Sequence, residues 1–235
     1  MKSIVVILGA LAPLVLGACA STRPPSPVNA TSAGVGIRVK TRAPVKIFSN
    51  EPDGVVFVKL SEGGGPPYTD GSMLSSNFAD DGYFYLLNAP PGRYVAVLCG
   101  RIQAAPPTAP PAAPPKGTSV SVSVGIGKTE YTTYFPADMV KLTEVTVTPG
   151  AVAFMGDYVV DMSTELADAD ETQRHFYHLL APKDESRDFL AKAFSGDYQY
   201  KGTLHQRRED TQAREEFSKY AHESLTKAGW SIALQ

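Results

Sequence analysis

Apolar and polar residues alternate with a period of two along much of the chain from residue 34 to residue 162. Residues 34–40 read GVGIRVK and residues 119–126 read SVSVSVGI, so Val and Ile share one face. Because strand side chains point alternately to the two faces of a sheet, this period predicts half-buried strands. The same pattern, or a short run of branched residues, predicts strands at 45–47, 55–60, 83–88, 93–99, 145–148 and 152–162.

The strand expected at 152–162 has a glycine near its middle. Gly156 interrupts the alternation, and a glycine inside a strand often marks a β-bulge or a close approach of another backbone. The expected apolar face of this strand is formed by Val152, Phe154, Tyr158, Val160 and Met162.

Glycine and proline separate the predicted strands. Asp53-Gly54, Asp81-Gly82 and Pro149-Gly150 are turn signals, and many short alternating segments with such turns are typical of an antiparallel β-sandwich. We therefore predict a mainly β fold with an antiparallel sandwich over residues 34–163. Two long loops interrupt it: a polar, glycine-rich segment at 61–80 and a proline-rich loop at 103–117.

The pattern changes after residue 163. Residues 164–235 are expected to add a strand at 175–180 and two helices that pack on the sandwich as a cover. The first helix starts near Asp184 and stops at Gly196. The second spans 209–228, begins near Asp210 and stops at Gly229, with Trp230 packing back onto the body. Its apolar face is expected to hold Ala213, Phe217, Ala221, Leu225 and Ala228.

The N-terminus has the three-part layout of a secretory signal. Lys2 is basic, residues 4–16 are almost wholly apolar, and small residues follow. The apolar stretch is shorter than the roughly 20 residues that a membrane-spanning helix needs. Residues 1–18 are therefore predicted to be a signal peptide, and residues 19–33, rich in Pro, Ser, Thr and Ala, a flexible tether.

The signal ends in Leu16-Gly17-Ala18-Cys19, a string that resembles the lipobox of bacterial lipoproteins. The resemblance implies cleavage before Cys19 and acyl chains, palmitate among them, on that residue. Ala20 follows, and in Gram-negative families the absence of Asp there favours the outer membrane. An ordinary signal with an incidental cysteine is the alternative.

Charge and cysteine content narrow the possible partners. The net charge is −2, and removal of residues 1–18 takes away one lysine, which leaves −3. Such a weak charge favours neither nucleic acid nor an anionic membrane surface as a partner. Besides Cys19, Cys99 is the other cysteine, so no intramolecular disulfide is expected, and its apolar neighbours predict a buried side chain.

The motifs that could carry chemistry are weak. Residues 125–129, GIGKT, lack the glycine that a phosphate-binding loop needs five positions before its Gly-Lys pair. His175 and His178 would point to opposite faces of a strand, and the acidic run at 165–171 lacks the spacing of a calcium loop. We therefore predict no catalytic residue, no metal site, no cofactor and no enzymatic activity.

Tyrosines provide one candidate binding feature. Tyr68, Tyr83 and Tyr85 are candidates for an exposed aromatic patch that could bind a glycan or a protein. Packing in the core and across the sheet is the alternative use of these rings.

Two segments resemble a known fold family. Residues 81–97, DGYFYLLNAPPGRYVAV, are similar to the central hairpin of transthyretin-like or carboxypeptidase-regulatory-like domains, and residues 145–160 to the closing hairpin of small lipoproteins built on such domains. The resemblance implies a seven- or eight-strand transthyretin-like sandwich and a non-catalytic role. Together with the lipobox it suggests a lipid-anchored structural or interaction module of the cell envelope, partnered by an envelope protein. A module that binds a small ligand or a glycan is the alternative.

Overall fold

The computed structural model describes residues 23–43, 51–60, 72–104, 128–166, 198–231 and 233–234. Their strands are β1 (Gly34–Arg42), β2 (Gly54–Lys59), β3 (Ser72–Ser75), β4 (Phe78–Asp80), β5 (Tyr83–Leu87), β6 (Gly92–Ala104), β7 (Lys128–Tyr134), β8 (Val145–Val147), β9 (Ala151–Leu166), β10 (Tyr198–Arg208) and β11 (Ala233–Leu234). The helices are α1 (Ala137–Leu142), α4 (Thr211–Leu225) and the 3₁₀ turn η1 (Thr226–Ala228). A mainly β fold with a C-terminal helix is thus confirmed.

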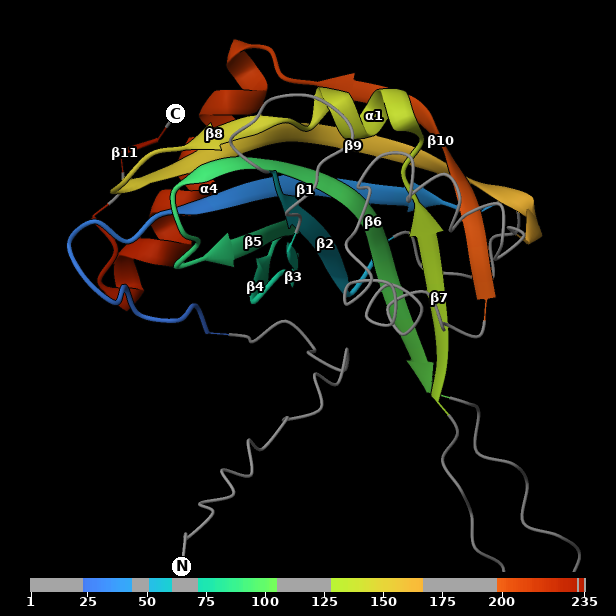
Figure 1. Cartoon of the computed structure of the whole chain (residues 1–235), viewed down its shortest axis with the longest axis horizontal. Coiled ribbons are helices and arrows are strands. Elements are labelled where there is room, and N and C mark those ends of the chain that lie inside the picture. Colours follow the sequence, from blue (N-terminus) through green and yellow to red (C-terminus); the bar gives the residue numbers. More distant parts are fainter. Residues whose placement is uncertain are drawn as a thin grey trace, which may run out of the picture.

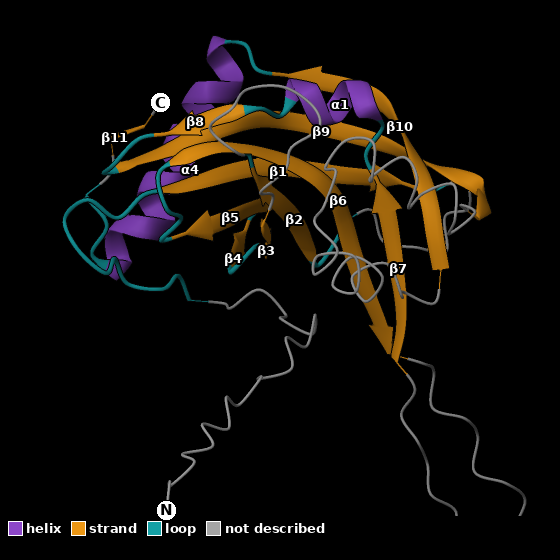
Figure 2. Ribbon diagram, viewed as in Figure 1, coloured by secondary structure: helices purple, strands orange, loops and turns teal. Residues whose placement is uncertain are grey.

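The strands form one curled sheet with the shape of a half-barrel (Figures 1 and 2). Its order is β3-β2-β6-β7-β10-β9-β1-β5-β4, with β8 beside β6 and β11 beside β9. An antiparallel sandwich is not confirmed, because the sheet is mixed: β1 and β11 run parallel to β9, and β7 runs parallel to β10. Alternation along a strand reports burial but not the direction of the neighbouring strand, so the parallel pairs have no signature in the sequence.

Two apolar clusters lie on the faces of this sheet. The inner core joins β1, β2, β5, β6 and β9 with α1, and it contains Val35, Ile37 and Val39 of β1. The second cluster lies on the opposite face of β1, β5 and β9, where α4 covers it, and we call it the helix seat. The helix seat consists of Phe78, Tyr83, Tyr85, Leu87, Val152, Phe154, Ala213, Phe217, Ala221, Leu225 and Trp230.

The bulge predicted at Gly156 is confirmed and determines what each face of β9 presents. The register with β1 shifts between Gly36, which faces Phe154, and Arg38, which faces Asp157, and Gly156 has φ of +117°. Phe154 therefore belongs to the helix seat and Tyr158 to the inner core. The prediction that these two aromatics share one face is wrong, because the extra residue of a bulge changes the phase of the alternation.

Helix α4 is confirmed in position and in its apolar face. Asp210 is the N-cap, and its side chain accepts a hydrogen bond of 2.8 Å from the Ala213 amide. Gly229, with φ of +88°, ends the following 3₁₀ turn. Trp230 packs back into the helix seat as predicted and is 4% exposed.

The N-terminal segment lies on the body. The Trp230 Nε1 donates a hydrogen bond of 2.8 Å to the Pro25 carbonyl, and the Asn88 side chain bonds the Ser26 carbonyl and the Val28 amide at 3.0 and 3.1 Å. From residue 25 onward the predicted tether is thus bonded to the body, and its flexibility stays a prediction. We call residues 23–33 the strap.

Several elements differ from the predicted boundaries. Strand β6 runs to Ala104, so the first residues of the loop predicted at 103–117 belong to the β6–β7 pairing. Strand β9 crosses the boundary expected at 163, and β10 lies inside the sheet between β7 and β9, so the tail supplies a central strand as well as a cover. The elements expected at 45–47, 119–126, 175–180 and 184–196 lie outside the described residues.

Candidate functional site

The helix seat is an aromatic contact between α4 and the sheet. The ring of Phe217 stacks on Phe154 with centroids 4.6 Å apart and lies 5.6 Å from Tyr83 and 6.0 Å from Tyr85. The helix can approach this closely because β1 has Gly36 at the contact: a Cβ there would lie 2.6 Å from the Phe217 ring. The absence of a side chain at Gly36 thus allows Phe217 of α4 to pack directly on β1.

The exposed aromatic patch predicted around Tyr83 and Tyr85 is wrong for both residues. Tyr83 is 1% exposed and Tyr85 is fully buried, because α4 covers them. Burial raises the pKa of Tyr83 to about 12 and raises that of Tyr85 further. Tyr68, the third candidate, lies outside the described residues.

Charged side chains from four elements meet at the edge of the helix seat. Asp157 of β9 lies 3.9 Å from the Arg38 guanidinium of β1 and 3.4 Å from that of Arg208 of β10. Arg208 also bonds both carboxylate oxygens of Glu216 on α4, at 3.2 and 3.3 Å. The Arg38 guanidinium lies over the Tyr83 ring, 5.1 Å from its centroid. These five residues form what we call the charge cluster.

The two carboxylates of the charge cluster respond in opposite ways to their surroundings. Burial raises the pKa of Asp157, and the nearby Arg38 and Arg208 offset this only in part because their contacts are long. The hydrogen bonds from Arg208 lower the pKa of Glu216. The bidentate pair of Arg208 and Glu216 therefore links α4 to β10. Asp157 of β9 also contacts Arg208, and its charge is only partly compensated.

Replacement of Gly36 by Val should destabilise the protein, although Val is a better strand residue than Gly. We expect a loss of about 1–3 kcal/mol in the free energy of unfolding, the usual cost of forcing extra carbon atoms into a packed contact. Urea unfolding followed by Trp230 fluorescence measures it. The matched control is Gly100→Val in β6, where the added Cβ would meet no atom closer than 3.9 Å. Equal effects at both glycines would contradict the contact with Phe217.

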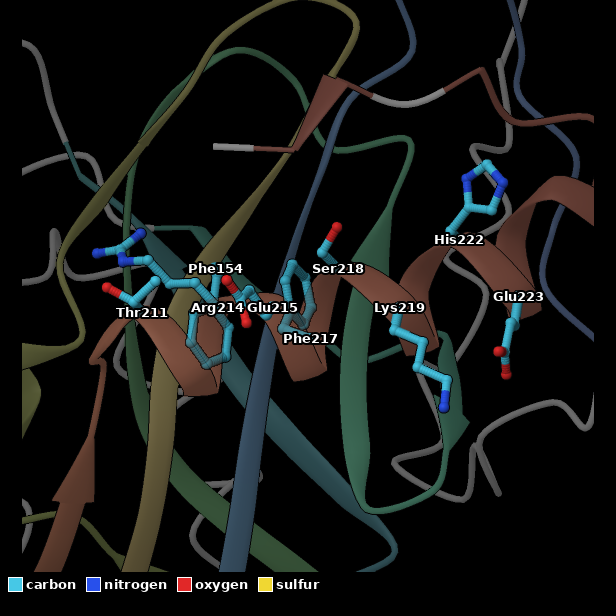
Figure 3. A pocket seen from close by; sticks show the side chains of 9 residues that line it. All are labelled: Phe154, Thr211, Arg214, Glu215, Phe217, Ser218, Lys219, His222 and Glu223. Carbon is cyan, nitrogen blue, oxygen red and sulfur yellow. The ribbon is translucent and has the colours of Figure 1, made fainter.

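A groove runs along the outer side of α4. It has a volume of about 690 Å³, and Phe154 and Phe217 form its apolar floor. Figure 3 shows these two rings beneath the polar side chains of the helix. Its polar rim consists of Thr211, Arg214, Glu215, Ser218, Lys219, His222 and Glu223. The rim charges are of both signs, so the groove favours neither an anion nor a cation.

The remaining candidates are placed as follows. Cys99 is a free cysteine and is buried as predicted, and burial raises the pKa of its thiol to about 12. His205 is exposed as predicted, and its Nδ1 lies 3.2 Å from Asp161. Leu16, Gly17, Ala18 and Cys19 lie outside the described residues, as do His175 and His178.

Within the described part of the chain, no three His, Cys, Asp or Glu side chains come together as a metal site would require. None of the described helices is both long and apolar enough to cross a membrane.

Comparisons with known proteins add no relative. No family model matches this chain, and neither a curated protein nor a solved structure matches it.

The charge cluster has only weak signals in the sequence. Arg38 falls on the polar face of an alternating strand, and Asp157 directly follows the glycine of the predicted bulge. These two positions could have indicated an ion pair, because a charged side chain on a strand face that another element covers requires a partner. Arg208 could not be assigned as a partner because β10 was not predicted, and Glu216 contacts the cluster through Arg208.

Proposed function

We propose that this chain is a lipid-anchored, non-catalytic protein of the bacterial cell envelope, which acts as a structural or interaction module at the outer membrane. Acyl chains on Cys19 would hold it there. The observation that carries the proposal is the lipobox-like string at residues 16–19 behind a short apolar signal, followed closely by a folded β-rich body. Several acyl chains are needed for stable anchoring, since a single chain binds a bilayer only marginally.

The arrangement of the aromatic residues supports an interaction module over the alternative of a glycan-binding module. Stacking on sugars requires exposed rings, and Tyr83 and Tyr85 are used to seat α4. The transthyretin-like resemblance stays a prediction, and the proposal does not depend on it.

Replacement of Cys19 by Ser tests the anchor. Without the thiol that receives the lipid, we expect a chain that keeps residues 1–18, carries no radiolabelled palmitate and is lost from the outer-membrane fraction. Gel mobility, palmitate labelling and membrane fractionation of expressing cells measure these three properties. The matched control is Cys99→Ser, which alters the other cysteine and should leave processing and labelling unchanged. Normal cleavage and labelling of the Cys19→Ser variant would refute the proposal.

A further inference from the structure

We infer that the strap sets the orientation of the body on its membrane, so that the end carrying the strap and the C-terminal end of α4 faces the lipid surface. This inference rests on the proposed acyl anchor at Cys19. The occupant of this face is the bilayer that holds the anchor.

The chain between the proposed anchor and the body is short. Four peptide units separate Cys19 from Arg23, the first residue that the structure describes, and they span about 14 Å at most. Trp230 and Asn88 bond the chain at Pro25, Ser26 and Val28. So short a connection to a fixed point leaves the body little freedom to turn the opposite end toward the lipid.

The chemistry of the strap supports the same orientation. Val28 is 78% exposed and is the one large apolar side chain exposed among the described residues. It is held at the surface because its own amide is bonded to Asn88. An apolar side chain fixed in water is unfavourable, and contact with a membrane interface would remove that cost.

The charges beside the start of the strap are of both signs. A cavity of about 460 Å³ lies between the start of the strap and α4, and the charged residues that line it are Arg23, Asp80, Asp81, Glu223 and Lys227. Two positive and three negative groups line this cavity, so the cavity itself presents no cluster of cations to anionic lipid. The covalent connection and the strap therefore determine the orientation.

The opposite end of the molecule lies far from the strap. Figure 1 shows the strap at the left end of the long axis and the far ends of β1 and β9 toward the right end. Gly150, which precedes β9, bonds the strap at the Thr31 carbonyl, whereas Thr203 of β10 pairs with Asp161 far along β9. Eleven residues separate Gly150 from Asp161 along the chain, which is about 36 Å of extended strand. Surfaces near Thr203 should thus lie clear of the membrane and be free to meet a partner.

Quenching of a fluorophore by spin-labelled lipid tests the orientation. The acylated full-length protein is reconstituted into phosphatidylethanolamine–phosphatidylglycerol vesicles that contain headgroup-spin-labelled lipid, with bimane attached at Val28→Cys or Thr203→Cys. The buried Cys99 should remain unlabelled, and the chain without an added cysteine measures that background. We expect quenching at least threefold stronger at position 28 than at position 203.

Two other outcomes would overturn the inference, and they are distinguishable. Vesicle-bound protein with equal quenching at the two positions, or stronger quenching at 203, contradicts the orientation while leaving the anchor in place. Protein that lacks acyl label and does not float with the vesicles contradicts the proposed function itself.

Asn88→Gly tests whether the strap is the cause. Asn88 has φ of +58°, which glycine adopts without strain, so this change removes only the two side-chain bonds to the strap. We expect the ratio of quenching at positions 28 and 203 to fall toward one. An unchanged ratio would show that the Asn88 bonds do not set the orientation, since the Trp230 bond to Pro25 is retained in this variant.

Discussion

The Phe217→Ala variant should lose about 3–5 kcal/mol of unfolding free energy, the usual cost of removing a buried phenylalanine. Phe217 is 1% exposed and contacts Phe154, Tyr83 and Tyr85. Its removal would leave a cavity that Gly36 cannot fill, because that residue has no side chain. Small domains are stable by only about 5–15 kcal/mol, so a large share of the total depends on this ring.

Urea unfolding followed by Trp230 fluorescence gives the loss, and hydrogen exchange shows where it falls. We expect the amides of α4 to exchange faster than those of β1 and β9, since α4 is held chiefly by the helix seat. Glu215→Ala is the matched control, because Glu215 lies on the exposed side of the same helix and surface changes usually stay within about 0.5 kcal/mol. A loss under 1 kcal/mol for Phe217→Ala would show that the helix does not depend on this contact.

The Asp157→Ala variant should lose about 3 kcal/mol of unfolding free energy, the low end of the range for breaking a buried ion pair. The loss would come from Arg38, whose side chain is 17% exposed and would have no carboxylate of β9 beside it, whereas Arg208 keeps its pair with Glu216. The raised pKa of Asp157 shows that its own charge is only partly compensated, so the pair itself adds little. The cost of removal is that of an unmatched cation. Urea unfolding at neutral pH measures the loss.

The matched control lies on the same strand. Asp161→Ala removes a carboxylate that is 41% exposed and pairs with Arg42 at 3.3 Å, so we expect a change of no more than about 1 kcal/mol. Adding Arg38→Met to the Asp157→Ala variant should recover part of the lost stability, since it removes the unmatched charge. Equal losses for Asp157→Ala and Asp161→Ala would contradict the account of the charge cluster.

The sequence predicted local elements well where the period of the pattern was clean. GVGIRVK became β1, YFYLLN became β5, and the helical spacing of Phe217 and its neighbours became the buried face of α4. The Asp81-Gly82 turn is confirmed by positive φ values of 48° and 76°. These features depend on residues close together in the chain, which is why a single sequence reveals them.

The sheet topology and the charge cluster depend on contacts between distant segments. Strand β10 reads YQYKGTLHQRR, with charged and polar residues at most positions, and its place beside β9 has no counterpart in a hydrophobic pattern. The prediction of an exposed aromatic patch was wrong for a related reason. Tyrosines on a strand can be exposed or covered by another element, and the sequence does not show that α4 covers Tyr83 and Tyr85. The contact of the strap with the body was not predicted, because the side chains of Asn88 and Trp230 that bond its backbone are distant in the sequence.

The position of β1 between β9 and β5 has a consequence for how the chain folds. It is the first described strand, and it pairs early in synthesis only with β5, because its other neighbour, β9, follows much later in the chain. Until β9 emerges, one edge of β1 presents unpaired amides and carbonyls, which are a template for aggregation. Non-local and parallel pairings also close slowly. The edge of β1 is therefore open to aggregation between formation of the β1–β5 pair and arrival of β9.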